Sequence, residues 1–409
     1  MKQRVVVTGV GIVSPIGHDL ETFWNAIKQG RSGIRPIQSF DATNHPVSVA
    51  AEVQDFDASE LLSQQDIKHN ARFIQFARVA ARKAYSTAGL EDVAIDPYQI
   101  GVSVSSSVGG IESLEQAAND FKTSRLRVSP YLISNSLINL AAGMIAIDIQ
   151  AKGKNQAIVT ACASGTNSIG EAYKAIQRGE QTVILAGASE AAITPLALAG
   201  FAAMRALSSS TDPAQACSPF DSKRSGTVMG EGAAILTLES LDHALARGAP
   251  IIGEIVGYAG NCDAFSVTAP DPEGASITRV MQDALNDSGI VSSDIGYVNA
   301  HGTATILNDR AESRAISAVF GAKGPYVSST KSVTGHLLGA GGAVEAVATI
   351  LALQEGVVPP NSNLSNVDSS CTANIVGASA VSADLQYAMT NSFGFGGHNA
   401  ALICKRWKR

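Results

Sequence analysis

The stretch Thr160-Ala-Cys-Ala-Ser-Gly-Thr-Asn167 joins two segments of different periodicity. Residues 156–160, before it, are a short apolar, β-branched run that predicts a buried strand. Residues 168–178, after it, have apolar side chains at helical spacing and a basic last turn, and Gly179 is typical of a helix C-terminus. We therefore expect Cys162 on a tight strand-to-helix turn, close to the N-terminus of a helix.

This placement makes Cys162 a candidate nucleophile. The N–H groups and the dipole at a helix N-terminus stabilise a thiolate, which is the reactive form of cysteine. The small residues on either side leave room for a substrate. On this stretch alone a buried structural cysteine stays an open alternative, because free cysteines are among the most buried residues of proteins.

The composition is that of an α/β protein. The chain has 409 residues, 45% of them hydrophobic, with 38 glycines and few aromatic residues, which is enough for two core-sized units joined by tight turns. A net charge of −6 argues against a nucleic-acid partner. No apolar run reaches about 18 residues, so we expect no membrane span.

Cysteine usage and the start of the chain predict a cytoplasmic protein. The five cysteines are scattered and odd in number, which argues against a disulfide scaffold and favours a reducing compartment. They are Cys162, Cys217, Cys262, Cys371 and Cys404. The chain leads directly into a strand-like run at residues 5–7, without the pattern of a signal peptide.

Similar arrangements of elements occur twice along the chain. Residues 159–179 and 328–356 each read strand, small-residue turn, long helix and glycine. We therefore expect two α/β halves, residues 1–250 and 251–409, packed into one body. Two further segments are each expected to form one continuous helix, residues 67–88 and the nearly all-apolar residues 135–150. The apolar one predicts an internal or interface helix.

Reactive side chains follow three strand-like runs. Further along the chain, His301 follows the strand-like run 295–299, and His336 follows the next such run by a few residues. Ligands of open α/β sheets gather at the carboxyl ends of strands, so we expect these three side chains to share one site. A lone histidine is usually structural, but two in equivalent places, each beside a glycine, favour a function. Lys331 adds a fixed positive charge to the turn of His336.

Other interpretations of these motifs stay open. One cysteine and two histidines could bind zinc, although their wide spacing and the lack of a local carboxylate disfavour it. Gly9, Gly11 and Gly17 do not have the spacing of a dinucleotide-binding loop. The Gly-Phe-Gly-Gly turn at residues 394–397 could move and direct backbone N–H groups at a developing oxyanion. It could equally be an ordinary glycine-rich hairpin.

Taken together, four motifs resemble the β-ketoacyl-acyl carrier protein synthases. They are Thr160-Ala-Cys162-Ala-Ser-Gly165, Asn299-Ala-His301-Gly-Thr-Ala-Thr305, Ser328-Ser-Thr-Lys331-Ser-Val-Thr-Gly-His336-Leu-Leu-Gly-Ala340 and Asn391-Ser-Phe393-Gly-Phe395-Gly-Gly397. Two histidines and this glycine-rich turn resemble the elongating (type II) class, not the Cys-His-Asn initiating class that uses acetyl-CoA. The resemblance implies the thiolase fold: two similar βαβαβαββ halves in a five-layer α-β-α-β-α sandwich, usually as a homodimer.

The resemblance also implies an activity. A 3-oxoacyl-carrier protein synthase II holds an acyl chain on Cys162 and condenses it with malonyl-carrier protein, with loss of CO2. His301 and His336 would stabilise the enolate, and Lys331 would order them, with Glu312 as its partner. No metal or diffusible cofactor is implied, because the substrates are carried on the phosphopantetheine of an acyl carrier protein, the expected partner.

Further binding roles follow from the same resemblance. The N–H groups of Cys162 and Phe395 would form the oxyanion hole. The remaining expectations concern the gate, the substrate pocket and the carrier-docking face. They assign Phe393, Gly394 and Phe395 to the gate, Thr303, Thr305, Val108 and Glu312 to substrate binding, and Lys68, Arg72, Arg127 and Arg205 to docking.

The chain departs from the common family pattern in several places. Ala304 and Ile306 stand where serine and proline are frequent, and residues 308–310, Asn-Asp-Arg, also resemble ketosynthases of specialised type II polyketide and polyene pathways. His398 replaces a frequent threonine, which we interpret as a structural variant. Such a specialised ketosynthase is the alternative to fatty-acid elongation. The presence of the candidate nucleophile Cys162 disfavours a non-catalytic chain-length-factor subunit. A CoA-dependent thiolase is disfavoured because Cys404 lies in the closing strand.

Overall fold

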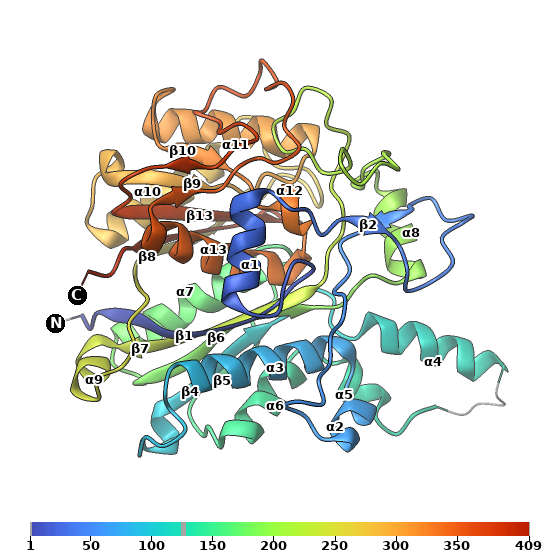
Figure 1. The fold of residues 1–409 in the computed structure, drawn as a ribbon, viewed down its shortest axis with the longest axis vertical. Helices are drawn as coiled ribbons and strands as arrows, with labels where there is room; N and C mark the ends of the chain where they lie inside the picture. Colours follow the sequence, from blue (N-terminus) through green and yellow to red (C-terminus); the bar gives the residue numbers. More distant parts are fainter. Residues whose placement is uncertain (1, 124–127, 409) are drawn as a thin grey trace.

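The computed structural model describes residues 2–123 and 128–408 and contains a ten-stranded mixed sheet with helices on both faces (Figure 1). Five strands come from the first part of the chain and have the order β5-β4-β6-β7-β1. Their bounds are β1 (Val5–Val13), β4 (Ile100–Ser105), β5 (Asn155–Gln156), β6 (Val183–Glu190) and β7 (Gly232–Ser240). β4 pairs in parallel with β5 and β6, whereas β7 is antiparallel to β6 and β1.

The other five strands repeat this arrangement in the order β10-β9-β13-β14-β8. Their bounds are β8 (Gly253–Cys262), β9 (Ile295–Asn299), β10 (Tyr326–Ser328), β13 (Tyr387–Gly394) and β14 (His398–Lys405). β9 is parallel to β10 and β13, and β14 is antiparallel to β13 and β8. The two sets meet where Val5–Val7 of β1 pair with residues 253–255 of β8. The chain therefore consists of two similar halves.

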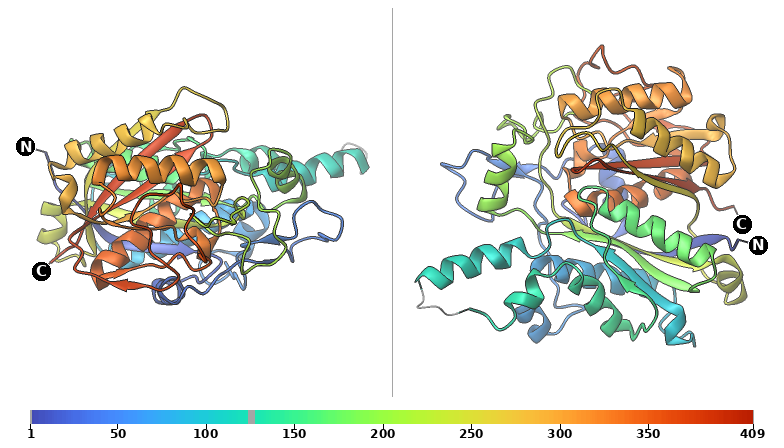
Figure 2. Two further views of the ribbon diagram at one scale, coloured as in Figure 1. Left: turned by 90° about the horizontal axis from the view of Figure 1, so that it is seen from above. Right: turned by 180° about the vertical axis from the view of Figure 1, so that it is seen from behind.

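Helices form three layers around these two sets of strands (Figure 1). Outer helices α3 (Arg72–Thr87) and α6 (Leu140–Ile149) cover the first set, and α10 (Ala275–Ser288) and α11 (Ile306–Phe320) cover the second. Between the sets lie α7 (Ser164–Gln177) and α13 (Gly341–Glu355). The view from behind in Figure 2 shows the same succession, which is the five-layer thiolase fold.

Small residues let the two central helices touch. A Cβ atom added to Gly165 of α7 would lie 2.8 Å from the backbone nitrogen of Ala343, and one added to Gly342 of α13 would lie 2.0 Å from Oγ1 of Thr166. Only glycine fits these positions, because any side chain would collide with the facing helix. The two glycines occupy corresponding places after the two reactive turns, so the same requirement operates in both halves.

The remaining elements are short and lie around this core. The helices are α1 (Leu20–Gln29), α2 (Gln64–His69), α4 (Ile111–Thr123), α5 (Leu132–Ser136), α8 (Pro195–Ala203), α9 (Leu241–Ala246) and α12 (Lys331–Thr334). Three 3-10 turns are η1 (Pro97–Gln99), η2 (Ser292–Asp294) and η3 (Leu338–Ala340). Two small ribbons pair β2 (Arg35–Pro36) with β3 (Val49–Ala50) and β11 (Val357–Val358) with β12 (Val381–Ser382).

Three expected elements are shorter than predicted. Residues 67–88 split into α2 and α3, because Asn70 is extended and its side-chain amide caps α2 by donating to the Asp66 carbonyl at 2.7 Å. Residues 135–150 likewise split into α5 and α6. Of the run 156–160 only Gln156 belongs to a strand, since β5 lies at the edge of the sheet and pairs with β4 through two residues.

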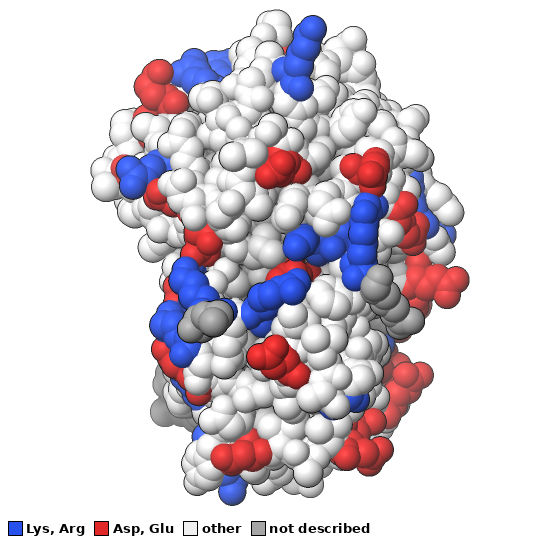
Figure 3. Space-filling model, turned by 90° about the vertical axis from the view of Figure 1, so that its left-hand side faces the viewer, with Lys and Arg blue, Asp and Glu red and all other residues white. Residues whose placement is uncertain are grey.

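The side of the molecule that carries both chain ends shows a band of lysines and arginines mixed with carboxylates (Figure 3). Many of these cations are paired. Arg4 binds Glu254 at 2.7 Å and Arg406 binds Asp384 at 2.6 Å. In Figure 1 this side lies opposite α8. Among the described residues, no helix is both long enough and apolar enough to cross a membrane.

Candidate active site

Cys162 lies on a strained turn immediately before α7. Ala161 has a φ of +48°, a value that residues with a side chain seldom adopt. The turn is held by Ser164, whose hydroxyl accepts from the N–H of Thr160 at 2.9 Å and donates to the carbonyl of Ala161 at 2.6 Å. The predicted helix start is confirmed, although the segment before it is not a full strand. The turn therefore holds Cys162 in a fixed position between the two halves of the chain.

Burial governs the charge state of Cys162. Burial, with a smaller contribution from the nearby Glu190 carboxyl, raises the pKa of the thiol to about 12. The charge of Lys331 and the backbone N–H groups of Phe395 and Cys162 act in the opposite direction but are outweighed. Burial therefore outweighs the stabilisation of a thiolate that the backbone N–H groups provide. The same two N–H groups lie close enough to the sulfur to lower this pKa, so they also lie near the position of an acyl oxygen bonded through Cys162.

His301 and His336 face each other across the site. Their ring centroids are 5.3 Å apart and their ring planes nearly perpendicular, at 85°. Both rings are buried, and burial together with the charge of Lys331 holds the pKa of each well below the usual value of 6.5. Both imidazoles are therefore neutral at physiological pH. The turns after β9 and α12 bring them together, as the sequence predicted.

The partner of Lys331 is Glu345, on the central helix α13. The two side chains form a buried ion pair, and Lys331 Nζ also lies 3.4 Å from Nδ1 of His301. An ammonium group can only donate, so Nδ1 of His301 accepts, and the ring proton of this neutral imidazole lies on Nε2.

Glu312 supports the turn of His301 from behind. Its two carboxylate oxygens accept the backbone N–H groups of His301 and Gly302, each at 2.8 Å. The residue is fully buried, which raises its pKa to about 7, and it does not line the cavity. The expectations that Glu312 pairs with Lys331 and contacts substrate are therefore corrected. Its role in the fold is to hold the backbone of the histidine turn.

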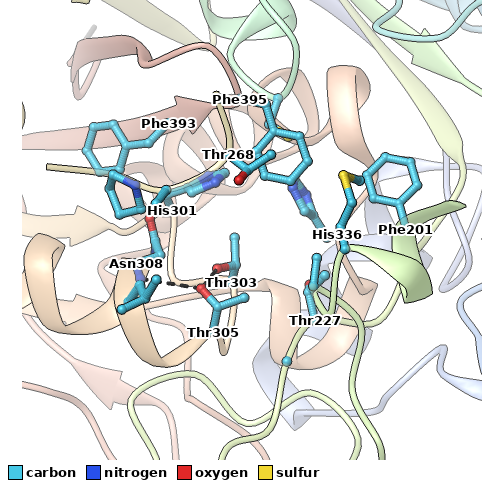
Figure 4. A pocket seen from close by; sticks show the side chains of 18 of the residues that line it. Phe201, Thr227, Thr268, His301, Thr303, Thr305, Asn308, His336, Phe393 and Phe395 are labelled. Carbon is cyan, nitrogen blue, oxygen red and sulfur yellow. Dashed lines mark hydrogen bonds between the residues drawn. The ribbon is translucent and has the colours of Figure 1, made fainter. Parts of the chain in front are cut away.

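The reactive residues open into one cavity of about 310 Å³ (Figure 4). Thr303 and Thr305 lie on one wall, with their hydroxyl oxygens 3.0 Å apart. The cavity brings together most of the residues that the sequence singled out. These are Cys162, Arg205, His301, Thr303, Thr305, His336, Phe393, Gly394 and Phe395.

The glycine-rich turn closes over the nucleophile. A Cβ atom on Gly394 would lie 2.7 Å from the carbonyl oxygen of Thr160, so this turn passes directly against the cysteine turn. The ring of Phe395 stacks on Phe201 of α8, with centroids 6.2 Å apart and planes at 23°. Beyond it, the N–H of Gly396 donates to the carbonyl of Val267 at 2.7 Å. The covering turn is thus tied to two other segments.

Val108 does not line this cavity. It lies half-buried in an apolar cluster that also contains Cys162 and Phe201, and its N–H donates to Glu190 at 3.2 Å. Val108 and Cys162 thus share an apolar cluster, and a role of Val108 in acyl binding stays a prediction.

The four expected docking residues differ in their surroundings. Lys68 is exposed on α2, and Arg205 is exposed at the cavity mouth. Arg72 instead binds Glu231 at 2.8 Å and lies over the ring of Phe76, so its charge is already neutralised. The docking role of Arg72 stays a prediction. Arg127 lies outside the described residues.

Three residues of the site were not found from the sequence. Glu345 was detectable, because it is the one acid among apolar residues in the first turns of α13. Glu190 ends the buried strand β6, and its carboxyl accepts N–H groups from Ser107 at 2.8 Å and Gly339 at 3.0 Å. Phe201 had no sequence signal. Within the described part of the chain, no three His, Cys, Asp or Glu side chains are grouped to hold a metal ion.

Two family models match the chain in succession. The model described as "Beta-ketoacyl synthase, N-terminal domain" matches residues 2–244, and "Beta-ketoacyl synthase, C-terminal domain" matches residues 252–365. The chain is 46% identical to the 3-oxoacyl-[acyl-carrier-protein] synthase 2 of Synechocystis sp., over 100% of this chain and 99% of that protein. It is 43% identical to the protein of the same name from Coxiella burnetii, over 99% of both.

Solved structures resemble the whole chain. "The ishigamide ketosynthase/chain length factor" superposes with a TM-score of 0.94 at 34% identity and covers 100% of both chains. A β-ketoacyl synthase from Burkholderia phymatum superposes with a TM-score of 0.93 at 35% identity over 99% of this chain and 100% of the other. A type II polyketide ketosynthase in complex with its acyl-carrier protein gives a TM-score of 0.92 at 32% identity over 100% of both.

Proposed function

This chain belongs to the β-ketoacyl synthase family, and we propose that it is a 3-oxoacyl-[acyl-carrier-protein] synthase of the elongating class. It is an acyltransferase that lengthens an acyl chain by two carbons in a decarboxylating Claisen condensation. One observation carries the proposal: Cys162 lines one cavity together with two neutral histidines, His301 and His336.

The first half-reaction transfers the acyl group to Cys162. The sulfur attacks the carbonyl carbon of the acyl thioester, and the N–H groups of Cys162 and Phe395 stabilise the oxyanion. The carbon–sulfur bond to the carrier then breaks, and the proton from the Cys162 thiol ends on the departing pantetheine thiol.

The second half-reaction forms the carbon–carbon bond. The malonyl thioester loses CO2, and its electron pair becomes an enolate whose oxygen accepts hydrogen bonds from His301 and His336. The α-carbon attacks the acyl carbonyl on Cys162, releasing the 3-oxoacyl product and a cysteine that takes up one proton. Because His301 carries its proton on Nε2, it can donate to the enolate without changing tautomer. The balanced reaction uses no redox or metal cofactor, and we propose none.

We further propose an acyl carrier protein as partner, a homodimer as the assembly and the cytoplasm as the location. Thr303 and Thr305 offer hydroxyls to the pantetheine, and Arg205 at the mouth suits an acidic carrier. Exposed apolar side chains on neighbouring elements support the dimer. They include Leu114 and Phe121 of α4, Ile133 of α5, Leu137 directly after α5, and Ile147 of α6. Five free cysteines accord with a reducing compartment.

The decisive experiment supplies malonyl-carrier protein together with acyl-carrier proteins of increasing length and identifies the products by mass. We expect 3-oxoacyl-carrier products two carbons longer than each accepted acyl donor. Formation of a thioester on the enzyme without any elongated product would contradict the proposal.

A second candidate is a ketosynthase of a specialised type II polyketide or polyene pathway. Two observations favour it: the similarity to the ishigamide ketosynthase/chain length factor and the Asn308-Asp309-Arg310 sequence. Repeated extension of one chain without reduction of its oxo groups, observed in the same incubation, would support this candidate. A single two-carbon extension of each bound acyl chain would support fatty-acid elongation.

A further inference from the structure

Thr227 contributes an unpaired hydroxyl to the cavity wall. Its side chain lines the cavity, only 6% of the residue is exposed, and Oγ1 has no hydrogen-bond partner among the described residues. Of the described cavity-lining residues, only His336 shares this condition, at Nδ1. Burying a hydroxyl without a partner is unfavourable, so native structures seldom leave one unless a ligand or water completes it.

The backbone fixes Thr227 in this position. Its N–H donates to the carbonyl of Ala206 at 2.9 Å, and its carbonyl accepts from the N–H of Ser208 at 2.8 Å. The next residue, Val228, turns its side chain into a separate apolar cluster, whereas Met229 again lines the cavity. This alternation is that of an extended strand, in which every second side chain faces the same way. The hydroxyl therefore belongs to a rigid wall.

The same segment holds His336. The carbonyl of Val228 accepts the N–H of His336 at 2.7 Å, so Thr227 adjoins the residue that anchors the histidine backbone. Figure 4 shows Thr227 in the wall beside His336, across from Thr303 and Thr305. A substrate group that is held near His336 consequently lies close to the part of the wall that carries Thr227.

We infer that Thr227 donates a hydrogen bond to the carboxylate of the malonyl group and so selects the extender substrate. The inference rests on the proposed function. In malonyl thioester the carboxylate is one carbon from the carbonyl that the histidines polarise, so a donor adjoining His336 suits it. A hydroxyl–carboxylate bond is charge-assisted and stronger than one between neutral groups.

The neutral character of this donor also suits the chemistry. The carboxylate must leave as CO2, and an interaction that is stronger before decarboxylation than in the transition state raises the barrier. A hydroxyl orients the carboxylate with a single bond, whereas an arginine or lysine would stabilise it far more. The neighbouring Met229 and Leu338 are apolar and offer no competing donor. Thr227 thus favours binding of the malonyl group without stabilising its carboxylate so strongly that decarboxylation becomes slow.

A purely structural role is the competing explanation. Burial raises the pKa of the Cys217 thiol to about 12, and the Thr227 side chain lies close enough to this thiol to act in the opposite direction as a hydrogen-bonding neighbour. If Thr227 served only this contact, replacing it would lower the stability of the fold and affect both half-reactions alike. Binding of the malonyl carboxylate predicts an effect on the second half-reaction alone.

The test compares Thr227→Val, which keeps the shape but removes the hydroxyl, with Thr227→Ser, which keeps the hydroxyl. We expect the valine variant to raise KM for malonyl-carrier protein about tenfold, the loss of one hydrogen bond to a charged group. Serine should restore most of this loss. KM for the acyl donor, from the rate of Cys162 acylation, should change much less. Thr211→Val, the same change at an exposed threonine outside the cavity, is the matched control.

Each other outcome overturns the inference. An unchanged malonyl KM in the valine variant would exclude the hydrogen bond. Equal losses in both half-reactions, or a lower melting temperature, would indicate a structural role. A loss confined to acyl donors that carry oxygen atoms would show that the acyl chain is the ligand. Failure of the wild-type protein to condense malonyl-carrier protein at all would instead reject the proposed function itself.

Discussion

Lys331 Nζ lies 3.4 Å from Nδ1 of His301 and is paired on its other side with the Glu345 carboxylate. The pair joins α12 to the central helix α13 and holds one cation fully buried beside the imidazole. Burial and, after it, the charge of Lys331 hold the pKa of His301 low. With Lys331 as the donor to Nδ1, the ring proton of His301 lies on Nε2, where a developing enolate needs a donor.

Variants that remove the charge of Lys331, alone or together with that of Glu345, should distinguish its effect on stability from its effect on catalysis. Lys331→Met alone should destabilise the fold by about 3–5 kcal/mol, because the Glu345 carboxylate would remain buried without a partner. The double variant Lys331→Met/Glu345→Gln removes both charges and should fold, but its condensation rate should fall about a hundredfold as His301 loses its fixed tautomer. Urea unfolding and product formation measure the two effects. Wild-type condensation by the double variant would contradict this role.

Cys162→Ala should abolish acyl transfer, because the thioester intermediate needs this sulfur. Intact-protein and peptide mass spectrometry after incubation with an acyl-carrier protein should find one acyl adduct, on Cys162. The matched control is Cys262→Ala, since Cys262 is exposed and free. An adduct that persists in the Cys162 variant, on any of the other four cysteines, would reject the assignment.

Glu312 should make stability depend on pH. Burial raises its pKa from 4.5 to about 7, so between these pH values the folded protein binds a proton that the unfolded chain has released. This stabilising contribution is complete below about pH 4.5 and is lost as the pH rises through about 7. Glu312→Gln cannot titrate and should lack this part of the slope. Free energies of unfolding from pH 4.5 to 8 that run parallel in both proteins would refute the assignment.

Phe395 and Phe201 should act as one gate, because their rings stack over the cavity. Flanking glycines, at φ +83° for Gly396 and +76° for Gly397, allow the turn to move. Phe395→Ala should slow condensation, Phe201→Ala should do the same, and the double variant should lose little more than either alone. Steady-state rates with a fixed acyl donor measure this coupling. Fully additive losses would mean that the rings act independently.

Val108→Phe should shorten the acceptable acyl chain. Val108 packs in the apolar cluster that contains Cys162, and a phenyl ring there would fill the space that an acyl tail needs. Chains longer than about six to eight carbons should be excluded, with short donors still elongated. Product masses from a series of acyl donors provide the measurement. Normal elongation of long chains by this variant would show that the acyl tail does not pass Val108.

The sequence by itself determined the two halves, the helix that begins after Cys162 and the convergence of His301 and His336. These features depend on short-range patterns: apolar periodicity decides helix or strand, and glycines with small residues mark the turns between them. Strand ends of an open α/β sheet meet at one edge, so the three reactive turns could be placed in one site before their distances were known.

Tertiary structure alone decided the partners and charge states of these residues. Lys331 could have reached Glu312 or Glu345, and only the packing of α12 against α13 selects Glu345. The thiol of Cys162 sits at a helix terminus, yet its burial outweighs the local stabilisation of a thiolate. Thr227 enters the site through a loop with no recognisable motif. Burial and through-space contacts set all three properties, because they depend on residues brought together from distant parts of the chain.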